Sequence, residues 1–167
     1  MLHIYYGDGK GKTSAAVGAA VRAAGAGLRV RFVQFFKNGD SSEIAMLRRI
    51  GIDCRVPDRP FALGERIEGR VQAELTASYN RLLRETAEAA ASVDLVVLDE
   101  GLDALALGLA DGDVLAQMLD RPNAPEVILT GHTAVPKWMN RADYLTQMRA
   151  ERHPYVRGIS ARKGIEW

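Results

Sequence analysis

The sequence predicts an α/β fold, in which one domain over residues 1–167 holds a mostly parallel sheet with helices on both faces. Three observations lead to this fold class. Short apolar runs alternate with longer segments of helical character, which is the pattern of a parallel sheet covered on both sides. A glycine-rich loop with a Lys-Thr pair joins the first apolar run to the first helical segment. The length of 167 residues corresponds to one domain, at roughly 100–200 residues each.

Each element is expected from an apolar run or a helical segment and from the residues that end it. The run DLVVL at 94–98 is apolar and β-branched, which is typical of a buried strand. Gly25 and Gly27 end the first helix, and Ser41 and Ser42 are expected to cap the second. Strands are expected at residues 2–6, 28–35, 52–56, 94–98, 126–130 and 144–148. Helices are expected at residues 13–26, 42–50 and 65–92.

Composition excludes several classes of protein. The chain has 22 Lys and Arg against 21 Asp and Glu, so its formal net charge of +1 favours neither nucleic acid nor a membrane surface as a partner. The one cysteine, Cys54, cannot form an internal disulfide and is expected in the core. There is no apolar run of about 18 residues and no basic segment followed by an apolar one at the N-terminus. These features predict a cytoplasmic protein without a membrane span.

The loop after the first strand has the composition of a phosphate-binding loop. Its glycines allow main-chain N–H groups to point inward, and the helix that follows adds partial positive charge. Lys12 is expected to reach the outer phosphates of a nucleotide, and the Thr13 hydroxyl to ligate Mg²⁺. Three residues separate Gly7 from Gly11, one fewer than in the usual pattern. The loop comprises Gly7, Asp8, Gly9, Lys10, Gly11, Lys12, Thr13 and Ser14.

Two other interpretations of this loop fit less well. A simple glycine-rich turn with exposed lysines would not need a strand, a Lys-Thr pair and a helix in this order. A dinucleotide-binding turn would need glycine at position 12, where Lys12 stands.

Two carboxylates end the buried strand at 94–98. In phosphate-loop proteins an Asp at this place holds the magnesium shell, and a neighbouring Glu takes a base or metal role. Asp99 and Glu100 stand there, and the spacing does not tell which one contacts the metal. The alternative is an ordinary solvated strand end.

These motifs resemble the phosphate-loop type of corrinoid adenosyltransferase, and the resemblance is collinear along nearly the whole chain, weakest between residues 55 and 91. It implies a phosphate-loop fold that transfers the 5′-deoxyadenosyl group of ATP to the Co(I) of a reduced corrinoid and releases triphosphate. It also implies Mg²⁺ or Mn²⁺, a homodimer, and an electron-donor protein such as a flavodoxin. The matching segments are YYGDGKGKTSAAVGAAVRAAGAGLRV, VQFFKNGDSSE, DLVVLDE with ALALGL, EVILTGH, ADYLTQM and HPYVRGISARKGIEW.

The resemblance also assigns roles to single residues. Lys12 and Glu100 are the matching catalytic positions, and Thr13, Glu100 and Asp99 are the matching metal positions. Phe61 matches a phenylalanine that packs against the lower face of the corrin ring, although Leu63 stands where some relatives have tryptophan. His132 is expected at the corrinoid in place of an arginine that many members carry.

Two other functions remain open at this stage. A nucleotide-binding switch or accessory protein would keep the loop and transfer nothing. A small-molecule kinase or NTPase would need an arginine-rich lid, for which Arg149, Arg152 and Arg157 are the candidates. The products distinguish the three: triphosphate from adenosyl transfer, ADP from a kinase or NTPase, and none from a switch.

Overall fold

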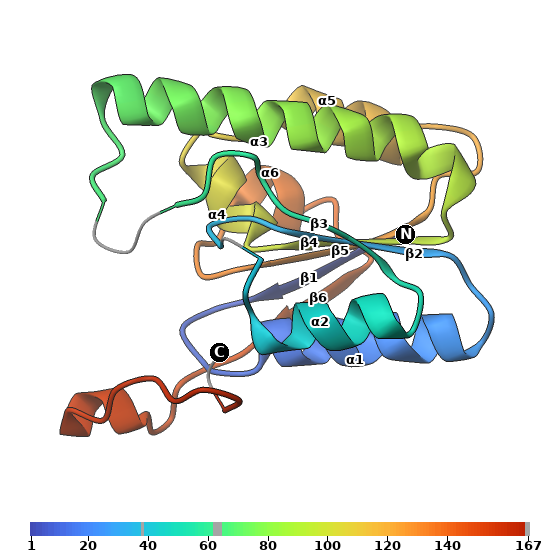
Figure 1. Cartoon of the computed structure of the whole chain (residues 1–167). Coiled ribbons are helices and arrows are strands. Elements are labelled where there is room, and N and C mark those ends of the chain that lie inside the picture. The colour runs from blue at the N-terminus through green and yellow to red at the C-terminus, as the bar shows by residue number, and fades with distance from the viewer. Residues whose placement is uncertain (38, 62–64, 166–167) are drawn as a thin grey trace.

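The computed structural model describes residues 1–37, 39–61 and 65–165. Within these residues six strands form one sheet in the order β3-β2-β4-β5-β1-β6, and every neighbouring pair is parallel (Figure 1). The strands are β1 (Leu2–Tyr6), β2 (Val30–Gln34), β3 (Asp53–Arg55), β4 (Leu95–Asp99), β5 (Glu126–Gly131) and β6 (Tyr144–Gln147). The α-helices are α1 (Lys12–Gly25), α2 (Ser42–Arg49), α3 (Gly69–Ala89), α4 (Gly101–Ala106), α5 (Gly112–Leu119) and α6 (Pro136–Met139), and the short 3₁₀ turns are η1 (Ala90–Ser92) and η2 (Pro154–Arg157).

The predicted fold class is confirmed, and all six expected strands occur close to their expected places. The long helix differs most: α3 begins at Gly69 instead of residue 65 and gives way to a 3₁₀ turn at Ala90. Cys54 is buried, as expected.

Helices cover both faces of the sheet, because alternate residues of each buried strand point to opposite sides. The helices α1 and α2 lie on one face, and α3 to α6 lie on the other (Figure 1). Under α1, the small side chains of Ala16 and Ala20 pack against Phe32 of β2. On the opposite face, Tyr79 of α3 packs among residues of the larger core that includes Val96.

The predicted cap of α2 is confirmed in its position but not in its side-chain hydrogen bond. Ser41 occupies the N-cap position, but its side chain makes no capping hydrogen bond. Its hydroxyl instead donates to Oε1 of Gln34 at 3.1 Å. This hydrogen bond connects the loop before α2 to the end of β2, so the Ser41 side chain stabilises the end of the strand and not the start of the helix.

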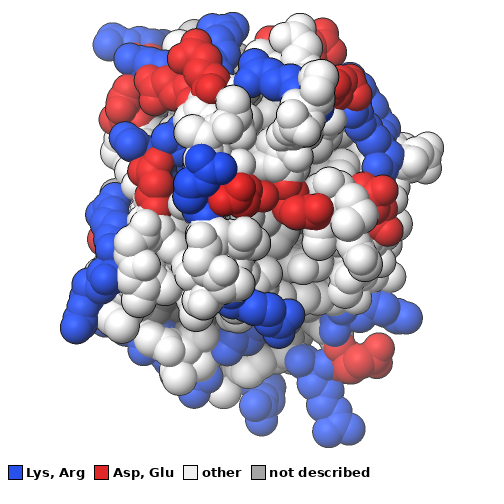
Figure 2. All heavy atoms as spheres, turned by 90° about the vertical axis from the view of Figure 1, so that its right-hand side faces the viewer, with Lys and Arg blue, Asp and Glu red and all other residues white. Residues whose placement is uncertain are grey.

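The two ends of the sheet differ in character. At the carboxyl ends, on the left of Figure 1, lie the loop between β1 and α1, the turn after β4 and the C-terminal segment. Figure 2 shows the opposite face, where basic and acidic side chains lie together in the upper half and basic ones predominate in the lower half. No helix of the described ranges has both the length and the apolar character needed to cross a bilayer.

Candidate functional site

The glycine-rich loop lies between β1 and α1 and is covered by the segment after β6. Gly7 and Gly11 have φ of 113° and 116°, in the left-handed region that favours glycine. The main-chain N–H of Gly9 donates to the carbonyl of Met148 at 2.8 Å. A Cβ atom on Gly9 would lie 2.7 Å from the carbonyl carbon of Met148, so only glycine fits here. The loop is therefore shaped by its own glycines and by the chain that crosses over it.

Lys12 is the first residue of α1, and its side chain is buried inside this loop. Its Nζ donates to the carbonyls of Gly7 at 2.8 Å and Gly9 at 3.0 Å. The positive charge is thus concentrated where the loop N–H groups and the N-terminus of the helix also favour an anion.

Asp99 ends β4 with a fully buried carboxylate, and four polar side chains surround it. Its Oδ1 accepts hydrogen bonds from the hydroxyls of Thr13 at 2.9 Å and Thr130 at 2.7 Å. Its Oδ2 accepts from Nε2 of Gln34 at 3.2 Å and lies 3.9 Å from Nζ of Lys37. The network connects β4 to its two sheet neighbours, β2 and β5, and to the start of α1.

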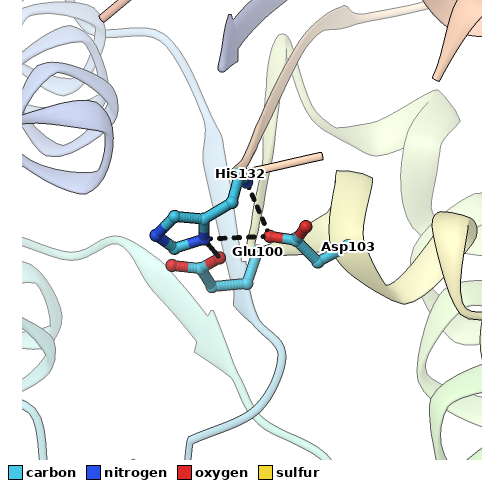
Figure 3. A group of neighbouring side chains, drawn as sticks. All are labelled: Glu100, Asp103 and His132. Carbon is cyan, nitrogen blue, oxygen red and sulfur yellow. Dashed lines mark hydrogen bonds and ion pairs between the residues drawn. The ribbon is translucent and has the colours of Figure 1, made fainter. Parts of the chain in front are cut away.

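Glu100 belongs to a second group, with Asp103 of α4 and His132 after β5 (Figure 3). The Nδ1 atom of His132 lies 3.5 Å from Oε2 of Glu100 and 3.2 Å from Oδ2 of Asp103. Asp103 also accepts the main-chain N–H groups of His132 at 2.7 Å and Thr133 at 2.9 Å, which fixes the turn after β5. One ligand atom from each of the three side chains lies within 4.8 Å of the others.

This arrangement shifts the pKa of two of its members. The hydrogen bond to Glu100, with the charge of that carboxylate, raises the pKa of His132 against the opposing effect of burial. Burial of Asp103 would raise the pKa of its carboxyl, but the hydrogen bonds from His132 and Thr133 outweigh burial and lower it. A neighbouring negative charge therefore favours the cationic form of His132.

Residues 8–14 of the loop line one hollow of about 290 Å³ together with Glu100, His132 and His153, whereas Asp103 does not line it. A second hollow of about 280 Å³ shares Thr13, Ser14 and Ile165 with the first and extends to Lys37 and Glu43. The two form a groove that runs from the phosphate loop past Thr13 to the chain after β2. Of the expected metal residues, Thr13 and Glu100 thus line the groove, whereas Asp99 is fully buried and reaches it only through its hydrogen bond with Thr13.

Phe61 lies apart from this groove, on the side of the sheet covered by α3. Its ring packs edge-on against Phe36, with centroids 5.6 Å apart at 82°. Leu63, which stands where some relatives carry tryptophan, lies outside the described residues. The structure brings the loop, Asp99, Glu100 and His132 together and places Phe61 away from them, in the chain between β3 and α3.

Sequence reasoning missed four polar residues of this site: Gln34, Lys37, Thr130 and Asp103. Thr130 ends an apolar run, as Asp99 does, and that feature could have indicated it, whereas Gln34 lies inside the run expected at 28–35. Asp103 gives no such signal, because it follows Glu100 on a helix whose orientation depends on the packed fold.

The oxygen-rich donor set fits a hard divalent cation. Because the Thr13 hydroxyl donates its proton to Asp99, the lone pairs of its oxygen stay available as a ligand. The buried carboxylate of Asp99 holds that hydroxyl in place, and Glu100 lines the same hollow.

Comparison with known proteins now decides the family. The family model "ATP:corrinoid adenosyltransferase BtuR/CobO/CobP" matches residues 1–167. The chain belongs to this family. It is 36% identical to "Corrinoid adenosyltransferase" of Pseudomonas aeruginosa, over the whole of this chain and 83% of that protein. It is 30% identical to the protein of the same name from Escherichia coli K12 and 31% identical to "Corrinoid adenosyltransferase CobA" of Salmonella typhimurium, in each case over all of this chain and 85% of the relative.

Membership of the ATP:corrinoid adenosyltransferase family makes the chain an enzyme, a transferase of an alkyl group. The family name implies ATP and a corrinoid as its substrates. The family resemblance seen in the sequence is therefore confirmed.

Proposed function

We propose that this enzyme transfers the 5′-deoxyadenosyl group of ATP to the Co(I) of a reduced corrinoid. The electron pair of Co(I) attacks C5′ of the ribose, the cobalt–carbon bond forms, the C5′–O bond breaks, and triphosphate leaves. The observation that supports this most strongly is the groove in which the tight phosphate loop faces Glu100 and His132, in a chain matched by the family model from end to end.

The leaving group is a polyanion, so the residues of the loop act by stabilising negative charge. Lys12 would give up its bonds to the loop carbonyls and donate to phosphate oxygens, with the N–H groups of residues 7–14 beside it. The nucleophile carries no proton, so this proposal assigns no general base.

Thr13 and Glu100 would hold Mg²⁺ or Mn²⁺, with Asp99 fixing the Thr13 hydroxyl. When bound, the cation supplies charge stabilisation to the triphosphate. His132 would meet either the phosphates or the corrinoid from its place beside Glu100.

The corrinoid would lie against Phe61, where an apolar ring keeps water and axial ligands from the lower face of the cobalt. Exclusion of that ligand favours the reduction of Co(II) to Co(I) by one electron from a donor protein such as a flavodoxin. As the resemblance implies, we also propose that the enzyme acts as a homodimer.

The test is an anaerobic assay with ATP, Mg²⁺ and chemically reduced cob(I)alamin or cobinamide. We expect a light-sensitive adenosylcorrinoid, followed by its absorbance, with triphosphate as the phosphate product in equal amount. Formation of ADP would instead identify a kinase or NTPase. Retained ATP binding without turnover of several corrinoids would identify a nucleotide-binding switch.

A further inference from the structure

Two residues at the carboxyl edge of the sheet adopt a left-handed backbone conformation although they are not glycine. Phe36 follows β2 with φ 55°, and Glu100 follows β4 with φ 58°. The conformation is sterically unfavourable for a residue with a Cβ atom and persists where the surroundings impose it. Here the surroundings act alike: the N–H of Phe36 donates to Oη of Tyr79 at 3.0 Å, and that of Glu100 to Oγ1 of Thr130 at 2.9 Å. The main-chain N–H groups of Phe36 and Glu100 are thus held in the same way, each by one side-chain hydroxyl.

The ring of Phe36 belongs to an aromatic cluster formed by Phe35, Phe36, Phe61 and Tyr79. It packs edge-on against Phe61, at 5.6 Å, and against Tyr79, at 5.3 Å and 85°. Tyr79 and Phe35 are buried in the core, whereas Phe36 and Phe61 are only partly buried. The cluster therefore has an inner pair that anchors it and an outer pair that presents apolar ring surface.

Helix α3 fixes both outer rings through two consecutive residues. The Tyr79 hydroxyl holds the backbone of Phe36, and Oγ of Ser78 accepts the main-chain N–H of Arg59 at 3.1 Å. Nη1 of Arg59 in turn donates to Oε2 of Glu65 at 2.6 Å. Arg59 precedes Phe61 in the sequence and Glu65 follows it, so this pair brackets Phe61. Neither outer ring depends on its own loop alone for its position.

The cluster is joined to the nucleotide groove through the chain, at the residue after Phe36. Lys37, which follows Phe36 directly, lines the end of the groove away from the phosphate loop and lies 3.9 Å from Asp99. In the sheet, β2 lies next to β4, which carries Asp99 and leads into Glu100. Phe36 therefore precedes a residue of the groove in the chain and packs its ring against Phe61.

We propose that Phe36, together with Phe61, contacts the corrinoid, and that Tyr79 is the positioning residue that holds Phe36 in its left-handed conformation. This inference rests on the proposed function. The macrocycle of a corrinoid is broad and largely apolar, and two rings at 82° to one another offer it an edge and a face. Under this proposal the second aromatic contact with the corrinoid is made by Phe36, at the end of β2. It does not depend on an aromatic residue after Phe61.

Two variants separate the ring of Phe36 from its backbone. Phe36→Asn keeps a residue that tolerates the left-handed conformation and removes the ring. We expect it to raise the KM for the corrinoid on the order of tenfold, as the loss of one aromatic contact predicts, and to leave the KM for ATP unchanged. Tyr79→Phe keeps every ring and removes the hydroxyl, so we expect a smaller rise in the same KM.

A spectroscopic readout accompanies the kinetics. With ATP and cob(II)alamin bound, the wild-type enzyme should show the absorbance and electron paramagnetic resonance signals of cobalt without a lower ligand, and Phe36→Asn should weaken them. Phe32→Leu is the control, because it removes a ring buried under α1 on the other face. It should lower the melting temperature without changing the ratio of the two KM values.

The outcomes distinguish this inference from the proposed function. If the wild-type enzyme adenosylates cob(I)alamin but Phe36→Asn leaves the corrinoid KM and the cobalt signals unchanged, the inference alone is wrong. If Phe36→Asn raises the KM for ATP as much as the KM for the corrinoid, the ring has only a structural role, and the inference is also wrong. If the wild-type enzyme adenosylates no reduced corrinoid, the proposed function fails, and this inference with it.

Discussion

At the scale of single residues, the ammonium group of Lys12 is held inside the phosphate loop by two main-chain carbonyls. A triphosphate would offer it charged acceptors, whose hydrogen bonds are about twice as strong as those of neutral groups. We therefore expect Lys12→Ala to lower the rate of adenosylation by about 10²–10³, as removal of one charge-stabilising donor does elsewhere. The measurement is turnover with pre-reduced cob(I)alamin, together with circular dichroism to verify the fold.

The matched control for Lys12→Ala is Arg22→Ala, which removes a positive charge from the exposed last turn of the same helix. It should leave turnover near the wild-type value. Near-normal turnover of Lys12→Ala would contradict the assignment of a phosphate loop.

Phe61 allows a second test at this scale, because its proposed role concerns the reduction of cobalt rather than the transfer. Phe61→Ala should impair turnover from cob(II)alamin with a reductant far more than turnover from chemically prepared cob(I)alamin. The ratio of the two rates in wild-type and variant enzymes is the quantity to measure. Equal losses in both assays would remove Phe61 from the lower face of the corrinoid.

The sequence allowed the loop, Asp99 and Glu100 to be predicted, because glycines, a Lys-Thr pair and an acidic strand end are visible without a structure. It did not indicate that Gln34 and Thr130 bind the same carboxylate, since that depends on which strands are neighbours. The left-handed conformation of Phe36 could not be foreseen either, because it is imposed by a hydroxyl on α3, 43 residues away.

At the scale of elements, the phosphate loop and the chain after β6 form one packed unit. A methyl group on Gly9 would meet main-chain atoms of Met148 and Arg149 at 2.7–2.8 Å, which side-chain rotation cannot relieve. We expect Gly9→Ala to destabilise the enzyme by about 1–3 kcal/mol through overpacking. It should also weaken ATP binding, because the loop must move away from its present path. Chemical denaturation and ATP titration measure the two effects.

Gly18→Ala is the control for that variant, since Gly18 lies in α1 with nothing within 4 Å of an added Cβ. Alanine there should stabilise the helix by about 0.5–1 kcal/mol. Destabilisation by both variants to the same extent would show that the contact with residues 148–149 does not govern the loop.

The elements themselves followed from the sequence more readily than their order did. Apolar runs such as LVVLD and EVILTG each became a strand within one or two residues of the expected bounds. The sheet order places β5 between β1 and β4, and this brings Thr130 to Asp99 and His132 to the groove. That order is a property of tertiary packing, and no local pattern contains it.

At the scale of the whole molecule, the two ends of the sheet have different roles. The proposed active site lies at the carboxyl ends of the strands, and a stabilising ion pair lies at their amino ends. Arg29 and Asp94, which directly precede β2 and β4, are joined by three hydrogen bonds. Oδ2 of Asp94 accepts hydrogen bonds from the main-chain N–H of Arg29 at 2.8 Å and from its Nε at 3.0 Å, and Oδ1 accepts one from Nη2 at 3.0 Å. The hydrogen bonds from Arg29 lower the pKa of Asp94 to about 2. Because the carboxylate form is favoured by folding, the pair stabilises the enzyme at neutral pH.

A carboxyl whose pKa is lower in the folded state loses its stabilising effect as the pH falls, here between about 4, the ordinary value for Asp, and about 2. Asp94→Asn should therefore lower the melting temperature at pH 7. The difference in melting temperature between Asp94→Asn and the wild-type enzyme should shrink as the pH falls from 4 to 3. The matched control is Asp113→Asn, which removes an exposed carboxylate of α5 and should lower the melting temperature at pH 7 less than Asp94→Asn does. Adenosylation at pH 7 by Asp94→Asn should stay near the wild-type rate, because the site lies at the opposite end of the strands. A difference in melting temperature that stays constant from pH 7 to pH 3 would show that the charge of Asp94 does not stabilise the fold.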